Sequence, residues 1–515
     1  MRQQTSSKFL DRSADTLRTD PATRKKRPMA RHSAAEAPNE ARSYRDIPKP
    51  PVWPVLGAAP ALRRDALSFM LEARRAHGDV VAMPLGLKPA VQITHPDLVR
   101  HVLIDNSANY GRSPMTDRLK FMLGEGLVTA DGERWARQRR MMQPIFQRDR
   151  LDGLIPIMTA AVEDMLERWN VLARSGTPVD IGAQMGHLAL DIITRALFGT
   201  SGGPLAEDVI RCIPILQEYT ASLFWTFNPL AGKLPTPHRR RFRAALATID
   251  TIILRFIRER MAAGAGDADM LDALLKARDP ETGAVMDEKA LRDEVITLFL
   301  AGHETTANAL TWTWYLLDRH PEALDRLEVE AATVGSAPKT AEDLNGLGYA
   351  RRVAQEAMRI YPPVWSFNRL ALDTDTLGGY AIPRRATVFI PPWVLHRHPS
   401  FWEDPERFDP DRFTSARSAG RPRYAYLPFG AGPRTCIGSH LALMEMQVVL
   451  PLVASRYRLR LASDHPVSAQ ALITTRPSKP IMMRLEPQAK AGRSPGGTHS
   501  IPDHQVLGGG PEGGR

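Results

Sequence analysis

The sequence has few cysteines and no long apolar runs. Only Cys212 and Cys436 occur among 515 residues, which excludes a disulfide framework and fits a reducing compartment. No Cys-x-x-Cys spacing occurs, which excludes the usual structural zinc site. No stretch of about 18 apolar residues occurs either, so we expect no membrane span and a soluble, cytoplasmic protein.

Charge of one sign is concentrated at the N-terminus. The chain carries 68 Lys and Arg against 57 Asp and Glu, a net charge of +11. Residues 1–47 hold eleven of those basic and six of the acidic residues, and they lack an apolar run. We therefore predict a disordered basic extension at 1–47, with Met29 as an alternative start. A basic arm for a membrane or nucleic acid is the alternative, but the mildly basic remainder argues against a nucleic-acid partner.

The rest of the chain is predicted to be one mainly helical domain with small sheets. Residues 48–486 contain few linkers that would divide them, whereas 487–515 are Gly-rich and predicted to be disordered. Short β-branched runs at 80–85 and 90–94 predict a hairpin, and 377–390 predicts another strand pair with Gly378-Gly379 at one turn. Helical periodicity covers 67–77, 96–105, 154–175, 181–198, 206–226, 239–263, 288–318 and 341–360.

One glycine-rich segment carries a cysteine. Residues 429–438 read Phe-Gly-Ala-Gly-Pro-Arg-Thr-Cys-Ile-Gly, and an apolar helical pattern over 441–452 follows. The glycines allow tight turns and a close approach of backbone N–H groups. The N-terminus of the following helix and the nearby Arg434 would both favour the thiolate form of Cys436. A stabilised thiolate in such a loop is a nucleophile or a metal ligand.

The loop matches the pattern Phe-x-x-Gly-x-Arg-x-Cys-x-Gly at every fixed position, and it resembles the haem-ligand signature of the cytochrome P450 family. This resemblance implies a triangular helical body with haem b between a long central helix and the cysteine loop. It implies that Cys436 is the axial ligand of the iron, that Arg434 pairs with a haem propionate and that Phe429 packs against the ring. The other cofactor-binding candidates of the loop are Gly430 and Gly438.

A second segment, Ala301-Gly-His-Glu-Thr-Thr, lies inside the helix predicted over 288–318. Gly302 weakens the helix and threonine hydroxyls bond back to carbonyls, which would open the helix locally for a small ligand. Glu304 beside Thr305 is suited to proton delivery. The segment resembles the family's acid–alcohol motif, which implies that Glu304 and Thr305 are catalytic.

A third motif is a pair of opposite charges before a Tyr-Pro-Pro turn. Glu356 and Arg359 share one helix face and can pair. They resemble the family's Glu-x-x-Arg helix, whose partner is a downstream arginine, here assigned to Arg407 in Pro-Glu-Arg-Phe. We predict that these three side chains form a structural ion network that holds the cysteine loop in place.

A fourth motif is Trp135 with Arg139, which lie four residues apart on one helix face. The pair resembles the family's Trp-x-x-x-Arg motif, which implies a contact with haem propionate, and Arg369 is a weaker candidate for that task. The surrounding segment 133–150 is rich in arginine. It is either a solvated helix face or a basic docking patch for an acidic electron carrier.

The resemblance implies a monooxygenase that inserts one oxygen atom of O₂ into a lipophilic small molecule, such as a terpenoid, a fatty acid or a polyketide. Electrons would come from a separate ferredoxin or flavodoxin with its reductase, because the residues after Glu486 are too few for a redox domain. We expect a monomer. The alternatives are a peroxide-driven enzyme, a haem-thiolate isomerase or dehydratase, and a haem-binding sensor without turnover.

Large apolar side chains near the expected pocket predict a greasy substrate, although each could equally be part of the core. The candidates are Phe121, Phe224, Trp225, Phe299, Ala301, Val364, Trp365 and Phe367.

Overall fold

The computed structural model describes residues 41–488, apart from 202, 225–233, 265, 267–268 and 335–336. The residues from Arg42 onward form a compact unit. The predicted start of the folded body at residue 48 is therefore six residues too late: the Arg42 N–H donates to the carbonyl of Gly379 over 2.9 Å and pairs the chain with the strand at Tyr380. The predicted disorder of residues 1–40 and 489–515 lies outside the described residues.

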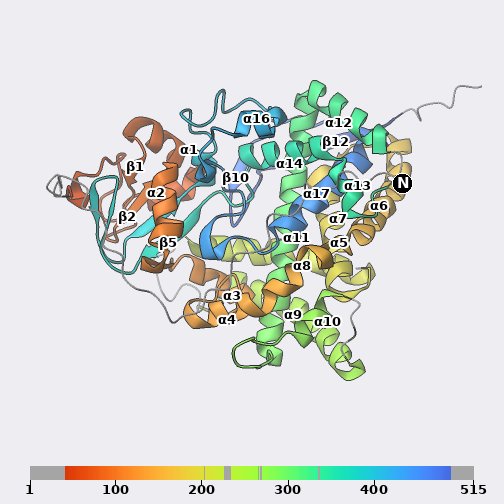
Figure 1. The fold of residues 1–515 in the computed structure, drawn as a ribbon, viewed down its shortest axis with the longest axis horizontal. Coiled ribbons are helices and arrows are strands. Elements are labelled where there is room, and N and C mark those ends of the chain that lie inside the picture. Colours follow the sequence, from red (N-terminus) through yellow and green to blue (C-terminus); the bar gives the residue numbers. More distant parts are fainter. Residues whose placement is uncertain are drawn as a thin grey trace, which may run out of the picture. The chain divides into compact units, whose positions relative to one another are not determined.

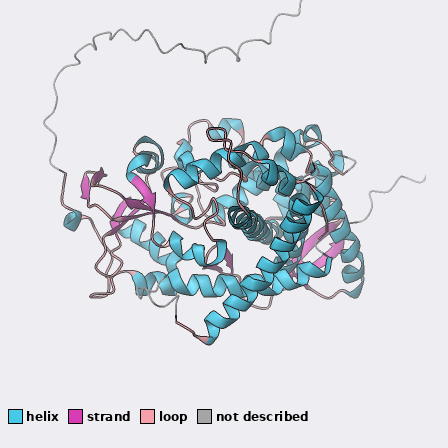
Figure 2. Cartoon of the chain, turned by 90° about the horizontal axis from the view of Figure 1, so that it is seen from below, coloured by secondary structure: helices cyan, strands magenta, loops and turns pink. Residues whose placement is uncertain are grey.

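Helices make up most of the described chain (Figures 1 and 2). None of them has the length and apolar character that crossing a bilayer requires, as far as the described residues extend. The α-helices are α1 (Ala59–His77), α2 (Pro96–Arg100), α3 (Lys120–Leu123), α4 (Gly132–Met142), α5 (Arg148–Asp152), α6 (Ile155–Ser175), α7 (Ile181–Phe198), α8 (Gly203–Phe224), α9 (Pro237–Ala263), α10 (Met270–Lys276), α11 (Glu288–Arg319), α12 (Pro321–Val334), α13 (Ala341–Asn345), α14 (Gly348–Ile360), α15 (Pro392–Leu395), α16 (Ser415–Ser418) and α17 (Ser439–Ala454).

The helix predictions are confirmed for α6, α7, α9, α11 and α17, within a few residues at each end. Three others need correction. Helix α1 begins eight residues before the predicted start at 67, but it is kinked at Asp65 (φ −159°, ψ 90°), and the predicted helix is the part after this kink. The segment 96–105 divides into α2 and a π-helical turn at His101–Asp105. The segment 341–360 forms two helices, because the chain turns at Gly346 and Leu347, and Leu347 has non-helical backbone angles at the start of α14.

The strands form small sheets. The largest has the order β1-β2-β8-β5-β3, with β1 (Val80–Ala82), β2 (Ala90–Ile93), β8 (Thr387–Ile390), β5 (Phe367–Ala371) and β3 (Tyr110–Arg112). Only β2 and β8 are parallel within it. A second sheet joins β4 (Val179–Asp180), β12 (Met482–Pro487) and β9 (Tyr457–Leu461), and two hairpins consist of β6 (Asp375–Leu377) with β7 (Tyr380–Ile382) and β10 (Ala469–Ala471) with β11 (Thr475–Pro477).

The predicted hairpin at 80–94 is confirmed as β1 and β2. The predicted strand pair within 377–390 is wrong in its pairing. The turn at Gly378-Gly379 joins β6 to β7, whereas β8 lies in the large sheet between β2 and β5. Local turn chemistry predicted the hairpin correctly, but the partner of β8 is decided by contacts with residues nearly 300 positions earlier in the chain.

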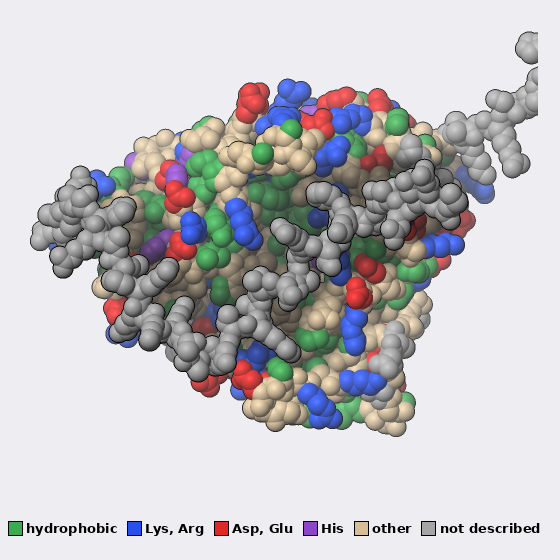
Figure 3. Space-filling view, in the orientation of Figure 1, with side chains coloured by type: hydrophobic (Ala, Val, Ile, Leu, Met, Phe, Trp, Pro, Cys, Tyr) green, Lys and Arg blue, Asp and Glu red, His purple; other side chains and the backbone are tan. Residues whose placement is uncertain are grey.

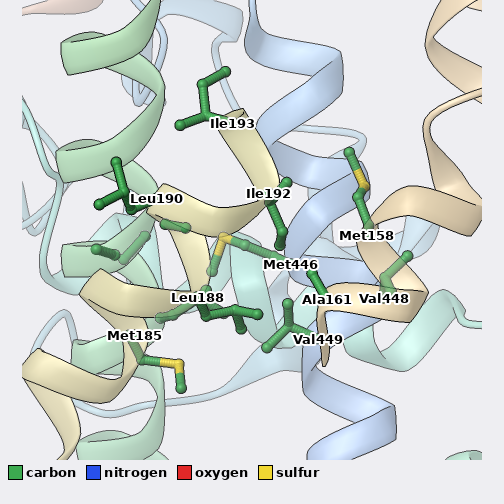
Figure 4. Packing of buried hydrophobic residues seen from close by; sticks show 14 of the residues in the cluster. Met158, Ala161, Met185, Leu188, Leu190, Ile192, Ile193, Met446, Val448 and Val449 are labelled. Carbon is green, nitrogen blue, oxygen red and sulfur yellow. The ribbon is translucent and has the colours of Figure 1, made fainter. Parts of the chain in front are cut away.

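Helix α11 is buried on nearly every side and passes through the middle of the helical part (Figure 1). It packs against α7, α14 and α17. Gly302 lets α7 approach closely, because a Cβ atom at this position would lie 3.1 Å from Cδ1 of Ile193. Figure 4 shows how side chains of α6, α7 and α17, among them Met158, Leu188 and Met446, meet in one hydrophobic cluster.

Candidate active site

The cysteine loop is held in a fixed shape by its own backbone. The Cys436 N–H donates to the carbonyl of Phe429 over 2.9 Å, and the Thr435 N–H donates to the carbonyl of Gly432 over 3.0 Å. Gly432 has φ +76°, and a Cβ atom there would lie 2.0 Å from the carbonyl oxygen of Leu103. Gly438, in contrast, has an ordinary φ of −88°. The loop therefore requires a glycine at 432, while the expected need for one at 438 is not seen in the backbone.

The groups that shift the pKa of the Cys436 thiol differ from those that the sequence predicted. Burial among protein atoms raises the pKa of the thiol, whereas the N–H of Gly438 and the guanidinium of Arg139 lower it. Arg434 does not contribute, because it points toward Asp131 instead. The Cys436 side chain is nevertheless exposed, in contrast to the buried side chain of Cys212.

The acid–alcohol segment occupies the middle of α11. The helix stays α-helical through residues 301–306, so the predicted local opening is not present. The hydroxyl of Thr305 donates to the carbonyl of Ala301 over 2.7 Å, as expected for a threonine that bonds back one turn. Ala301 is exposed although most of α11 is buried, which marks the point where the helix borders an opening.

Glu304 and Thr305 have different partners. The carboxylate of Glu304 accepts a hydrogen bond of 2.6 Å from the hydroxyl of Thr474, which in turn accepts one of 3.0 Å from the amide of Asn308. Burial raises the pKa of Glu304, while the Thr474 bond and the charge of Arg476 lower it. Glu304 also lines a cavity of about 400 Å³ between α7, α8, α11 and the hairpin β10–β11. One side of the acid is therefore open to a cavity that Arg476 and Lys479 also line.

His303, for which the sequence suggested no role, is a structural residue. Its Nε2 atom lies 3.1 Å from the carbonyl of Gly186 and ties α11 to α7. Burial lowers the pKa of its ring to about 4, so the imidazole is neutral at physiological pH.

Three arginines gather next to the cysteine loop. Arg112 on β3 lies directly opposite Arg369 on β5, and both side chains are partly buried near Arg434. Burial and the charge of Arg434 lower the pKa of Arg112 to about 9 and that of Arg369 to about 10. Among the described residues, only Arg434 of the three forms an ion pair, with Asp131. This cluster of positive charge is suited to a ligand with two negative groups.

Trp135 and Arg139 both contact residues of the cysteine loop, whereas the implied contact with a haem propionate stays a prediction. The guanidinium carbon of Arg434 lies 4.4 Å from the ring centre of Trp135. The Nη1 atom of Arg139 donates to the carbonyl of Thr435 over 2.9 Å, one residue before Cys436. The two side chains of α4 therefore support the loop from the same helix face.

The ion network contains a different third member from the one predicted. Glu356 and Arg359 form a fully buried pair with 2.7 Å between Oε2 and Nε. Arg407 contributes only its carbonyl, 3.0 Å from Nη2 of Arg359, and its side chain is exposed. Arg412 is the second cation, with its Nε atom 3.3 Å from Oε1 of Glu356. The assignment of Arg407 is therefore wrong.

Comparison with known proteins identifies the family. The profile described as cytochrome P450 matches residues 47–485. The chain belongs to the cytochrome P450 family. It is 38% identical over 423 residues to cyclooctatin synthase of Streptomyces melanosporofaciens, covering 81% of this chain and 91% of that one. It is 33% identical to pentalenene oxygenase of Streptomyces avermitilis, covering 87% and 97% of the two chains.

The fold agrees with this membership. A crystal structure of the haem domain of cytochrome P450DA superposes with a TM-score of 0.78 at 26% identity, covering 86% of this chain and 98% of that one. A second relative in Streptomyces melanosporofaciens, cyclooctat-9-en-7-ol 5-monooxygenase, is 38% identical over 79% of this chain and 88% of its own. The protein is a P450 monooxygenase, which uses haem, O₂ and electrons from a redox partner to oxidise a lipophilic small molecule.

The substrate-pocket candidates of this P450 divide into two groups. Phe299 and Trp365 are core residues: Phe299 contacts Phe198, and Nε1 of Trp365 donates to the carbonyl of Leu472 over 3.0 Å. Both side chains are buried against other core residues, and their place in the substrate pocket stays a prediction. Trp225 lies outside the described residues. The other candidates keep some exposed surface, namely Phe121, Phe224, Ala301, Val364 and Phe367.

Two functional residues of this P450 were missed from its sequence. Arg112 gave no signal, because its opposite position to Arg369 depends on the pairing of β3 with β5. Arg412 did give one: the pattern Pro-x-Arg-Phe occurs twice, at 405–408 and at 410–413, so there were two candidates for the third member of the network.

Proposed function

We propose that Cys436 is the axial ligand of the iron of haem b in this monooxygenase. The observation that carries the proposal is the partly buried group of Arg112, Arg369 and Arg434 beside the cysteine loop. The cluster has one carboxylate partner, Asp131, and its remaining positive charge matches the two propionates of a haem. The side chain of Cys436 is exposed and so accessible to a ligand. The residues present therefore fit the group.

When bound, haem supplies the activation of O₂ with two electrons and two protons. The N–H of Gly438 and the charge of Arg139 both lower the pKa of the Cys436 thiol, and so they favour the thiolate. Phe429 is partly buried beside the core, and Gly430 leaves room for the ring of Phe367, which lies 3.5 Å from where a Cβ atom would be. Trp135 and Arg139 hold the loop from α4.

Glu304 and Thr305 are the proposed proton donors. Thr305 presents its hydroxyl next to Ala301, at the exposed point of α11. Glu304 takes up protons on the side of the cavity that it lines and is held there by Thr474. Because burial raises its pKa, Glu304 holds a proton to a higher pH than an exposed glutamate does, which favours a role as a proton relay.

The proposed substrate is a terpenoid. The relatives named above act, by their names, on pentalenene and on cyclooctat-9-en-7-ol, an alkene and an alkenol. The exposed pocket candidates are apolar, and α3, which carries Phe121, contacts both α8 and α11. A fatty acid would need a cation for its carboxylate, and no pocket candidate supplies one.

The proposed electron donor is a separate, acidic ferredoxin or flavodoxin with its reductase. Within segment 133–150, Arg134 pairs with Glu125, Arg140 pairs with Glu281 and Arg139 points inward. In the described part of the chain, no ion pair involves Arg137, Arg148 or Arg150, and all three are exposed. The charges of Arg148 and Arg351 also lower the pKa of His440, which follows Cys436 by four residues. Positive charge therefore lies near the loop. A monomer in the cytoplasm stays the expectation.

The test is the absorption spectrum of the reduced protein with carbon monoxide. We expect the red-shifted Soret band of a thiolate ligand in the purified protein, its loss in Cys436→Ser, and its retention in the matched variant Cys212→Ser. If Cys436→Ser kept the band, another residue would be the ligand. Screening terpenoids and fatty acids for the low-to-high-spin shift then tests the substrate class.

The alternative activities have separate outcomes. An isomerase or dehydratase would turn over without electrons or O₂, a peroxide-driven enzyme would turn over without a redox partner, and a sensor would bind ligands without product. Measuring product with each supply removed in turn distinguishes them from the proposed monooxygenase.

A further inference from the structure

The chain between α3 and α4, residues 124–131, is held against α11 by two adjacent acids, and we call it the clamp loop. The carboxylate of Asp293 accepts a hydrogen bond of 2.9 Å from the N–H of Glu125. The carboxyl group of Glu294 accepts one of 2.9 Å from the N–H of Leu127. Both acids are buried. Two consecutive side chains of α11 therefore bind the backbone of a single loop.

Two glycines bring the clamp loop into direct contact with α11. A Cβ atom at Gly124, which has φ +64°, would overlap the carboxylate of Asp293. A Cβ atom at Gly126 would overlap the carbonyl oxygen of Asp293 and the hydroxyl of Thr297. A side chain at either position would therefore push the loop away from the helix.

The two acids differ in their other partners. Asp293 also pairs with Lys289 and Arg292, over 2.9 and 2.8 Å. Within the described part of the chain, Glu294 has no cation beside it and its Oε1 atom is buried without a hydrogen-bond partner. A buried carboxyl group with one such bond costs stability, and its presence in a folded protein needs an explanation. The bond of Glu294 goes to the clamp loop, so the position of this loop explains the acid.

The other end of the clamp loop reaches the arginines beside the cysteine loop. The carbonyl of Ala130 accepts hydrogen bonds from Nε of Arg112 over 2.9 Å and from Nη1 of Arg434 over 3.1 Å. Asp131 forms the ion pair with Arg434. The clamp loop is therefore fixed at both ends, by α11 and by the arginine cluster.

The clamp loop lies one helical turn from the exposed point of α11. Residues four apart lie on the same side of a helix, about 6 Å from each other along its axis. Thr297 lies against the loop at Gly126, and Ala301 on the next turn is exposed. The hydroxyl of Thr305 donates to the carbonyl of Ala301. The loop therefore borders the opening at which this hydroxyl lies.

We propose that Asp293 and Glu294 are positioning residues that limit the size of the substrate, because they hold the clamp loop as the wall of the substrate pocket next to Ala301. The inference rests on the haem site and the pocket proposed above, and adds to them a residue pair that determines specificity. A wall held rigidly in place favours small ligands, which it contacts closely, and excludes bulky ones. A released wall moves aside, so bulky ligands enter and small ligands lose contacts.

The test compares the binding of imidazole and of the much larger clotrimazole to the ferric holoenzyme, measured by the shift of the Soret band. Glu294→Leu removes the acceptor of the Leu127 N–H and keeps a side chain of similar size. We expect the ratio of the Kd for clotrimazole to the Kd for imidazole to fall at least about fivefold in this variant. Glu294→Gln keeps an acceptor oxygen and should keep the wild-type ratio. Amide hydrogen exchange in residues 124–131 should become faster in Glu294→Leu and not in Glu294→Gln.

A matched control separates positioning from stability. The carboxylate of Glu330 on α12 also accepts backbone hydrogen bonds, of 2.5 and 2.7 Å, from the N–H groups of Tyr349 and Ala350 at the start of α14. Glu330→Leu should lower the melting temperature and leave the ratio of the two Kd values unchanged. Gly126→Ala is a second way to displace the clamp loop, and it should lower the ratio as Glu294→Leu does, including where Glu294→Leu does not fold.

Three results would overturn the proposal. The first is an unchanged ratio in Glu294→Leu, or in Gly126→Ala where Glu294→Leu does not fold. The second is an equal fall in Glu294→Leu and Glu294→Gln, which would assign the effect to the charge. The third is an equal fall in Glu330→Leu, which would assign it to a general loss of stability.

The carbon monoxide spectrum of each variant separates these results from a failure of the proposed haem ligand. A wild-type protein without the red-shifted band would contradict the role of Cys436. A wild type and a Glu294→Leu variant that both show the band, with the same ratio of Kd values, would contradict only the role of the clamp loop.

Discussion

At the scale of single residues, the glycines of the cysteine loop are not equivalent. Gly432 combines φ +76° with a contact to the Leu103 carbonyl that leaves no room for a side chain. Gly438 has a negative φ, and a Cβ atom there would lie 3.9 Å from the ring of Phe146. The backbone conformation and the close contact therefore require a glycine at position 432 but not at position 438.

Alanine substitutions at these two positions test this difference. Gly432→Ala should lower the free energy of unfolding by more than about 2 kcal/mol, because a left-handed residue costs roughly 1–2 kcal/mol and the clash adds to it. Gly438→Ala should change stability by less than about 1 kcal/mol. Urea unfolding of both variants measures this, and equal losses would contradict the geometry.

Thr474 is a positioning residue for Glu304. Removing its hydroxyl in Thr474→Val removes a contact that lowers the pKa of Glu304, so that pKa should rise further and the pH profile of turnover should move to higher pH. We expect roughly tenfold less product per electron consumed, since proton delivery depends on the placement of the acid.

Two controls make this prediction specific. Thr474→Ser keeps the donor and should restore the profile. Thr475→Val removes a neighbouring buried hydroxyl that has no partner among the described residues, and it should leave the profile unchanged. A shift in Thr475→Val as large as in Thr474→Val would show that packing, and not the hydrogen bond, is responsible.

At the scale of elements, the buried charges of α14 attach this helix to the chain at 405–413. Arg359 donates to the carbonyls of His396, Pro405 and Arg407 while it pairs with Glu356. Arg412, in the short 3-10 helix at Pro410–Phe413, adds a second positive charge to the same carboxylate. The network thus fixes α14 against the loop that precedes the cysteine segment.

Arg412→Ala should therefore lower the free energy of unfolding by about 3 kcal/mol, since it leaves a buried carboxylate with one cation where there were two. Arg407→Ala is the matched control, and it should change stability by less than about 0.5 kcal/mol because only the backbone of Arg407 takes part. Thermal and urea unfolding measure both; a larger loss for Arg407→Ala would restore the prediction made from the sequence.

At the scale of the whole molecule, charges of both signs are interspersed over the surface (Figure 3), while a few ionisable groups lie in the interior. Glu445 on α17 is the strongest case: burial alone raises its pKa to about 8. Glu294 on α11 is similar, with a pKa raised to about 7 mainly by burial. Both hold a proton in the folded chain that the unfolded chain releases at lower pH.

This linkage makes stability fall as pH rises. From pH 5 to 8 the folded chain binds the Glu445 proton while the unfolded chain does not, so the free energy of unfolding decreases by up to about 1.4 kcal/mol per pH unit, and the loss levels off above the folded pKa. Glu445→Gln should reduce this slope, and Glu342→Gln, at an exposed position of α13, should not. If the free energies of unfolding of the wild type and of Glu445→Gln changed in parallel with pH, the raised pKa of Glu445 would be contradicted.

The sequence by itself determined the helices with strong periodicity and the residues of the cysteine loop, because both depend on neighbours within a few positions. It also determined the Glu356–Arg359 pair, whose members share a helix face. Tertiary structure decided what depends on distant segments: Arg112 opposite Arg369, Arg412 in place of Arg407, Thr474 on Glu304, and the burial of Phe299 and Trp365. Local sequence patterns do not predict these contacts, because a hydrogen bond or an ion pair between distant segments forms only when the chain packs. Packing in turn depends on all segments at once.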